Sequence, residues 1–126
     1  DSGIESIDDL DGKLVGVQQG TTGESYATEN AKGAELLQYP SDGELWPAMQ
    51  AGTIDAILQD QPVNIEHQKA DPDYVIVEEY NTDEQYGFAF AKGQKDALRE
   101  AVNGALQELR DSGEYQEIYD TYFAAE

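Results

Sequence analysis

Short apolar runs alternate with helix-like segments along most of the chain. Branched and aromatic side chains predict strands at residues 13–18, 35–39, 56–58, 74–77 and 86–90. Turn residues and apolar stripes of helical spacing predict helices near residues 21–33, 41–52 and 62–70. This order predicts an α/β fold, with a doubly wound, mostly parallel, five-stranded sheet, right-handed crossovers and helices on both faces. The run at 56–58 is wholly apolar, so we expect it at the centre of the sheet.

From Asp96 onward the pattern is helical only, and Gly113 interrupts it. The last apolar stripe has helical spacing and consists of Tyr115, Ile118, Tyr119, Tyr122 and Phe123. Packing in a core is the ordinary explanation of such a stripe, and a surface that binds a partner is the alternative. The pattern therefore divides the chain into an α/β lobe at residues 4–92 and a C-terminal helical segment at residues 93–126.

Charge and composition limit the classes of partner that the chain can bind. The 126 residues fit one compact domain and carry 27 acidic against seven basic side chains, a net charge of -20 that repels nucleic acid and anionic membranes. The absence of cysteine argues against a disulfide framework and thiolate metal sites. The apolar runs are far shorter than the roughly 20 residues of a membrane span. No leader pattern begins at Asp1, so we expect any export signal to have been removed or never to have existed.

The segment 15–24 leads an apolar strand into a turn of glycine and threonine that opens a helix. Glycine lets the backbone approach a ligand closely, and the N–H groups at a helix start favour a carboxylate or phosphate. Thr21 can cap this helix while Glu24 reaches back, as in a capping box. A tight turn with a helix cap and no ligand is the structural alternative. The residues of the expected anion-binding turn are Gln18, Gly20, Thr21, Thr22 and Gly23.

Asp60 follows the apolar run 56–58 and precedes Pro62. Ligands of open parallel sheets bind outside the carboxyl ends of the strands, so we expect Asp60 and the anion-binding turn at one edge. A zwitterion such as an amino acid suits this pair, because the turn binds its carboxylate and Asp60 binds its ammonium group. The alternative role of Asp60 is to cap the next helix.

Other chemistries lack support. The turn has neither the lysine of a phosphate loop nor the spacing Gly-x-Gly-x-x-Gly, which argues against nucleotide binding. His67 is the only histidine, and without a cysteine or a nucleophile elbow we expect a surface role for it. Acidic pairs such as Glu78-Glu79 are poorly placed to share a metal ion. We therefore predict that the protein is not an enzyme and has no catalytic residue, metal or other cofactor.

Over residues 7–123 the chain resembles the second lobe and C-terminal helices of a type II periplasmic solute-binding protein of the polar amino-acid family, the bacterial extracellular solute-binding proteins of family 3. The order and spacing of several motifs carry this resemblance. These motifs are residues 9–13, 15–24, 48–56, 59–60, 86–93, 102–106, 113–115 and 122–123.

The resemblance implies two lobes that close around an amino acid without chemistry on it. It also implies delivery to the membrane permease of an ATP-driven ABC transporter, from an extracytoplasmic position as a periplasmic protein or cell-surface lipoprotein. By position, Thr22 and Gly23 match contacts to the α-carboxylate, and Asp60 matches the contact to the α-amino group. Gln18 matches a variable wall position, where its amide favours a polar ligand.

The family normally carries a first lobe before the position of Asp1, and that lobe supplies aromatic residues and an arginine to the ligand. In this chain the arginines are Arg99 and Arg110, both in the helical tail. The tail normally packs on the first lobe, so we expect it to repack on its own sheet or to form a homodimer or domain swap with a second copy. The functional alternatives are a ligand-sensing module of a receptor kinase or glutamate-receptor-like protein, and a solute-binding-like dehydratase.

Overall fold

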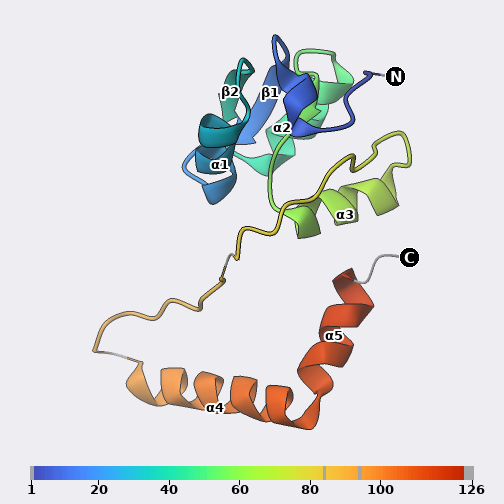
Figure 1. Cartoon of the computed structure of the whole chain (residues 1–126). Coiled ribbons are helices and arrows are strands. Elements are labelled where there is room, and N and C mark those ends of the chain that lie inside the picture. The colour runs from blue at the N-terminus through green and yellow to red at the C-terminus, as the bar shows by residue number, and fades with distance from the viewer. Residues whose placement is uncertain (1, 84, 94, 124–126) are drawn as a thin grey trace. The chain divides into compact units, whose positions relative to one another are not determined.

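The computed structural model of the chain describes residues 2–83, 85–93 and 95–123 (Figure 1). These residues form two units, Asp1–Tyr80 and Asn81–Glu126, and each unit is described by itself. The sequence pattern predicts a boundary after residue 92, whereas the division in the structure places the stretch 81–92 with the C-terminal helices. Residues 94 and 124–126 of the expected helical segment lie outside the described part of the chain.

The first unit is a small α/β layer structure. Its three-stranded parallel sheet has the order β2-β1-β3. The elements are η1 (Ile7–Leu10), β1 (Leu14–Gln18), α1 (Thr22–Asn30), β2 (Glu35–Tyr39), α2 (Asp42–Gln50), β3 (Ala56–Ile57) and α3 (Gln61–Ala70). The predicted strands at 13–18, 35–39 and 56–58 and the three helices after them are therefore confirmed, with the ends shifted by a few residues.

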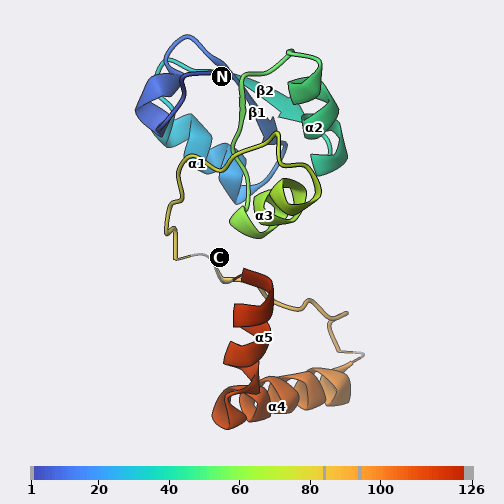
Figure 2. The same cartoon turned by 90° about the vertical axis from the view of Figure 1, so that its right-hand side faces the viewer.

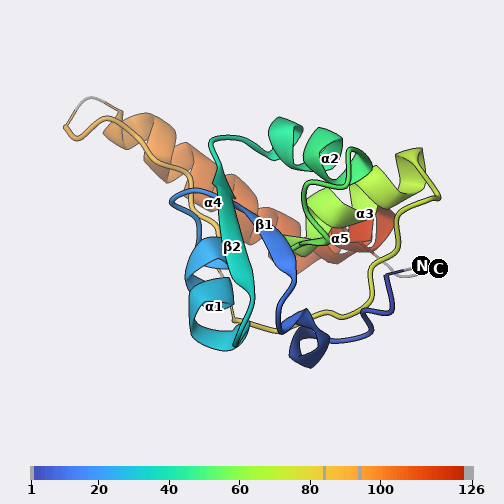
Figure 3. The same ribbon diagram turned by 90° about the horizontal axis from the view of Figure 1, so that it is seen from above.

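Strand β1 lies at the centre of the sheet and is covered on both sides. Val15 and Val17 are fully buried and belong to a cluster that includes Ala27 of α1. Gly16 lies between them on the opposite face, where a Cβ atom would meet Leu45 of α2. Helices α1 and α2 therefore cover opposite faces, as Figures 2 and 3 show, and the predicted doubly wound arrangement is confirmed.

The prediction that residues 56–58 form the central strand is wrong. Strand β3 has two residues, is half-buried and pairs only with β1 among the described residues. The fully buried positions belong to β1, whose middle three residues are all buried. An apolar run indicates that a strand is covered by other elements. It does not reveal the order of the strands in the sheet, and so it does not reveal which strand has neighbours on both sides.

The predicted strands at 74–77 and 86–90 are also wrong, because the structure describes both segments without ladder pairing. The end of the first unit is held by side chains instead: Glu78 accepts a hydrogen bond from the Ile7 N–H at 2.9 Å, and the ring of Tyr80 lies 5.2 Å from that of Tyr26. Burial, together with the neighbouring Glu78 carboxylate, raises the pKa of Tyr80. A segment with alternating large and small side chains forms a strand only where a partner strand lies beside it.

The second unit contains helices α4 (Asp96–Ser112) and α5 (Glu114–Phe123). Gly113 separates them with a φ of 87°, the left-handed conformation that glycine adopts without strain, which confirms the predicted break. Within this unit the apolar stripe of α5 is exposed, with Ile118 at 50% and Tyr122 at 57%. No helix among the described residues is both long and apolar enough to cross a bilayer.

Replacing Gly16 by alanine tests the central packing of β1. The new Cβ would lie 2.5 Å from Ile54 Cδ1 and 2.8 Å from Leu45 Cδ2, so both side chains must move. We expect Gly16→Ala to lower the free energy of unfolding by about 1–3 kcal/mol. Urea denaturation, monitored by the fluorescence of Trp46, the only tryptophan, measures this free energy. The control is Gly43→Ala, whose Cβ has room; equal stability of the two variants would contradict this packing.

The carboxylate of Asp9 ties down the start of η1. It accepts hydrogen bonds from the N–H groups of Glu5 at 3.1 Å and Ser6 at 3.0 Å, and from the Ser6 hydroxyl at 3.1 Å. These donors, the Glu5 N–H first, lower the pKa of Asp9 from its ordinary value of 3.8. The pKa of Asp9 is therefore lower in the folded state than in the unfolded state. The ionised carboxylate stabilises the fold at any pH above the unfolded-state pKa. This stabilisation is lost as the pH falls through the folded-state pKa.

We therefore expect Asp9→Ala to lower the melting temperature at pH 7, and this difference from the unmodified protein to shrink as the pH falls below about 4. Differential scanning fluorimetry at several pH values measures both effects. Asp8→Ala is the matched control, because it removes a neighbouring exposed carboxylate. A destabilisation by Asp9→Ala that stays constant from pH 7 to pH 2 would exclude a role for the ionised carboxylate.

Candidate ligand-binding site

The turn after β1 and the loop after β3 lie side by side. Parallel pairing aligns Val15 with Ala56 and Gly16 with Ile57, so both strands end at the same edge of the sheet. A Cβ atom added at Gly23 would lie 3.4 Å from Gln59 Cα and 3.5 Å from the Leu58 carbonyl oxygen. These are ordinary van der Waals distances, so the turn lies next to the loop that leads to Asp60.

Thr21 holds the turn together from within. It is the N-cap residue of α1, and its Oγ1 accepts a hydrogen bond from the Glu24 N–H at 3.2 Å. The same hydroxyl donates to the Gln18 carbonyl at 2.8 Å. The predicted cap is therefore confirmed, and the Thr21 hydroxyl joins the end of β1 to the first turn of α1.

Glu24 reaches back one residue further than a capping box requires. Its Oε2 accepts the Gly20 N–H at 2.6 Å, whereas the reciprocal bond of a capping box would go to Thr21. Gly20 has a φ of 76°, in the left-handed region that favours glycine. The Gly20 N–H and the Thr21 hydroxyl thus form hydrogen bonds within the turn. That these two residues contact a ligand stays a prediction.

Two bonds tie the turn to the neighbouring strand β2. The Gln19 N–H donates to the Tyr39 carbonyl at 2.8 Å, which extends the β1–β2 ladder by one residue. The side-chain amide of Gln38 donates to Oε1 of Glu24. The turn is therefore fixed on one side by β2 and meets the loop after β3 on the other.

The remaining predicted residues lie at the same edge. Gln18 is the last residue of β1 and is half-buried, and Thr22 is the first residue of α1. Neither the stretch 18–24 nor the stretch 58–62 contains a lysine or an arginine. The positive charge available to an anion here is consequently that of backbone N–H groups at the start of α1.

Asp60 occupies the N-cap position of α3, but its side chain makes no cap hydrogen bond. Its carbonyl accepts the Val63 N–H at 3.1 Å and so starts the helix. The neighbouring Gln59 side chain donates to Asn64 Oδ1 at 2.9 Å, which links the loop to the first turn of α3. The alternative interpretation, in which Asp60 caps α3, therefore holds for its backbone carbonyl but not for its carboxylate.

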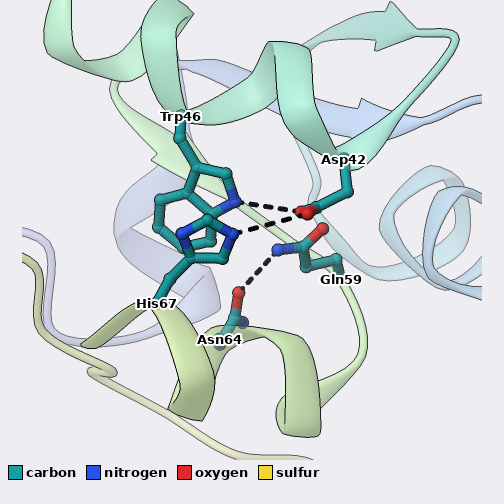
Figure 4. Close-up of polar contacts among 5 residues, drawn as sticks. All are labelled: Asp42, Trp46, Gln59, Asn64 and His67. Carbon is teal, nitrogen blue, oxygen red and sulfur yellow. Dashed lines mark hydrogen bonds and ion pairs between the residues drawn. The ribbon is translucent and has the colours of Figure 1, made fainter. Parts of the chain in front are cut away.

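A cluster of side chains joins α3 to α2 beside this loop (Figure 4). The rings of Trp46 and His67 are stacked with centroids 3.9 Å apart, and both rings direct a nitrogen at Asp42: Trp46 Nε1 lies 2.9 Å from Oδ1, and His67 Nε2 lies 3.4 Å from Oδ2. Tyr74 packs against the edge of Trp46 at 5.1 Å. The cluster holds α3, and with it the position of Asp60, against α2.

Sequence reasoning missed this cluster. His67 lies at the surface as expected, with its side chain 37% exposed, but the sequence did not reveal that it also contacts two residues of α2. The spacing of Asp42 and Trp46, four apart in a helix, was an available signal. Their contact with His67 depends on how two helices pack, which the local sequence does not show. No group of three or more potential metal ligands occurs among the residues that the structure describes.

Comparison with known proteins gives consistent results. The family model of the bacterial extracellular solute-binding proteins, family 3, matches residues 9–125. The chain is 34% identical over 124 residues to the L-cystine-binding protein TcyJ of Escherichia coli K12, covering 98% of this chain and 46% of that protein. It is 34% identical over 127 residues to the histidine-binding periplasmic protein of the same strain, covering 94% of this chain and 49% of that protein. The chain thus spans about half the length of these relatives.

Solved structures agree with the fold. An ancestral arginine-binding protein bound to glutamine matches with a TM-score of 0.78 and 34% identity, covering 99% of this chain and 56% of that one. The second substrate-binding domain of Lactococcus lactis GlnP matches with a TM-score of 0.67 and 32% identity, covering 100% and 55%. An ancestral amino acid-binding protein described as a precursor of cyclohexadienyl dehydratase matches with a TM-score of 0.73 and 32% identity, covering 95% and 51%.

The relatives named above are binding proteins rather than enzymes, in agreement with the expectation from the sequence. The parallel sheet, the helices on both faces and the turn at the edge of β1 also agree with the type II fold of these structures. The match to the family model covers nearly the whole chain. The chain therefore belongs to the bacterial extracellular solute-binding proteins of family 3 and contains one lobe of the type II fold.

Proposed function

We propose that this chain is the amino-acid-binding lobe of a substrate-binding protein that serves an ABC importer. The observation that carries the proposal is the proximity of Gly23 to the backbone of Gln59, which supports an anion-binding role for this turn beside the loop of Asp60. The N–H groups at Thr22 and Gly23 would bind the α-carboxylate, and Asp60 would bind the α-ammonium group. Gly20 and Thr21 would shape the turn, and Gln18 would line the wall near the ligand side chain.

The names of the relatives support an amino-acid ligand, since two of them bind cystine and histidine, and one of the solved structures is bound to glutamine. We propose the corresponding extracytoplasmic location, in the periplasm or as a cell-surface lipoprotein. A membrane permease of the transporter and a first lobe are the proposed partners. The exposed apolar stripe of α5 would contact that first lobe, and a second copy of the chain is the alternative occupant.

The sensory module remains a second candidate function, because ligand binding by the same edge would serve a receptor equally well. The genes beside the coding sequence distinguish the two: permease and ATPase genes indicate transport, whereas fusion to a kinase or channel indicates sensing. A dehydratase activity has less support, because stretches 18–24 and 58–62 at this edge offer Glu24, which is bonded within the turn, and Asp60, but no lysine, histidine or cysteine to act as an opposed acid or base.

Removal of the Asp60 charge tests the proposed ammonium contact. In the two-lobed protein, Asp60→Asn should weaken amino-acid binding by about 2–5 kcal/mol, because it leaves a buried ammonium group without its countercharge. Isothermal titration calorimetry measures the loss. Asp73→Asn is the matched control, since Asp73 is an exposed carboxylate beyond the far end of α3. Equal affinities of the two variants would refute the role of Asp60.

The charge of the edge predicts which side chains the ligand carries. With Asp60 present and no lysine or arginine in stretches 18–24 and 58–62, a second ligand carboxylate would find no countercharge in these two loops. We expect L-glutamine to bind at least about tenfold more tightly than L-glutamate, which has nearly the same shape. Amide chemical-shift titrations of the 126-residue chain compare the two ligands, and tighter binding of L-glutamate would contradict the proposed electrostatics.

A further inference from the structure

Glu24 uses both oxygens of its carboxylate to connect three parts of the fold. Oε2 accepts the Gly20 N–H at 2.6 Å, and Oε1 accepts the side-chain amide of Gln38. Gly20 lies in the turn, Gln38 lies in β2, and Glu24 lies in the first turn of α1. One side chain therefore links the turn to the sheet and to the helix.

Gly20 lies at an open position in the turn. Its φ of 76° directs the peptide into a left-handed turn, and no atom outside Gly20 and its two chain neighbours lies within 4 Å of where a Cβ would be. The hydrogen bond to Glu24 adds a direct constraint on the Gly20 N–H, at a glycine, the residue type whose backbone is the most permissive. The orientation of this peptide affects the residues that follow it, Thr22 and Gly23, where the proposed ligand carboxylate binds.

The position of Glu24 is electrostatically unfavourable for the proposed ligand. A carboxylate in the first turn of α1 occupies the same positive end of the helix that would attract a ligand carboxylate, and like charges repel. Considered as a charge alone, Glu24 weakens the binding of an anion. A contribution of Glu24 to binding must therefore come from the geometry that it imposes.

We propose that Glu24 is a positioning residue of the carboxylate-binding turn, anchored by Gln38 of the adjacent strand; this inference rests on the function proposed above. Glu24 fixes the Gly20 peptide, and the fixed turn presents the N–H groups of Thr22 and Gly23 to the ligand carboxylate. Two predictions of opposite sign follow for its removal. Loss of a repelling charge would strengthen binding, whereas loss of a positioning contact weakens it.

The experiment uses the 126-residue chain and a pair of probes, L-arginine and its decarboxylated form agmatine, in amide chemical-shift titrations. We expect Glu24→Ala to weaken the binding of L-arginine by about tenfold, the loss that corresponds to one charge-assisted hydrogen bond. Agmatine binding should stay unchanged, because agmatine has no carboxylate. A general loss of structure would instead weaken both probes.

Two further variants separate geometry from charge and folding. Glu24→Gln removes the charge but keeps an oxygen for the Gly20 N–H, while its NH₂ group can donate to the oxygen of Gln38 once that amide turns over, so it should bind L-arginine at least as tightly as the unmodified chain. Glu29→Ala removes an exposed carboxylate from the same helix and should leave both affinities unchanged. Tighter L-arginine binding by Glu24→Ala, or equal changes for Glu24→Ala and Glu29→Ala, would overturn the proposal.

A measurement without ligand distinguishes this proposal from the proposed function. Hydrogen exchange of the Gly20 amide should be slow in the unmodified chain and in Glu29→Ala, and at least about tenfold faster in Glu24→Ala. If the unmodified chain binds neither these probes nor L-glutamine, the proposed function fails. Unchanged Gly20 protection in Glu24→Ala overturns the positioning role whatever the binding result.

Discussion

Parallel pairing of β1 with both of its neighbours is the constraint on which the candidate site depends. The register with β2 runs from Leu14–Glu35 to Gln18–Tyr39, and the register with β3 pairs Val15 with Ala56 and Gly16 with Ile57. In a parallel sheet every strand delivers its following loop to the same edge. Residues that are far apart in sequence, in the turn after Gln18 and in the loop before Asp60, therefore become neighbours through the pairing of their strands.

In this arrangement, helices pack on both faces of β1. Val15 and Val17 fill one side, and Gly16 leaves the other side open for Leu45 and Ile54. At the edge, Gly23 lies beside the backbone of Gln59, and a Cβ there would stand at an ordinary contact distance of 3.4 Å from Gln59 Cα. Of the two glycines, Gly16 is the one where a side chain would force its neighbours apart.

Local signals made much of this predictable from the sequence. The apolar run before Gln18, the cap at Thr21 and the proline after Asp60 act within a few residues, and the structure has the expected elements at these positions. The edge shared by the two loops followed from a general rule for parallel sheets. Such features need no knowledge of which strands are neighbours.

Features that depend on distant partners were not predictable. The segments 74–77 and 86–90 have strand-like composition, but a strand exists only where a ladder partner lies beside it, and the structure provides none among the described residues. The stack of Trp46 on His67 and the bond from Gln38 to Glu24 likewise join elements that are separated in sequence. These polar contacts were for this reason harder to foresee than the sheet edge at which the predicted site residues lie.

The approach of Gly23 to Gln59 is the central claim, and it can be measured directly in the free protein. A nuclear Overhauser spectrum of the labelled chain should show a cross-peak between an α-proton of Gly23 and the α-proton of Gln59, because the structure brings the two backbones into contact. Such a cross-peak would place the turn and the Asp60 loop at one edge. Its absence, with both resonances assigned and sharp, would contradict the account.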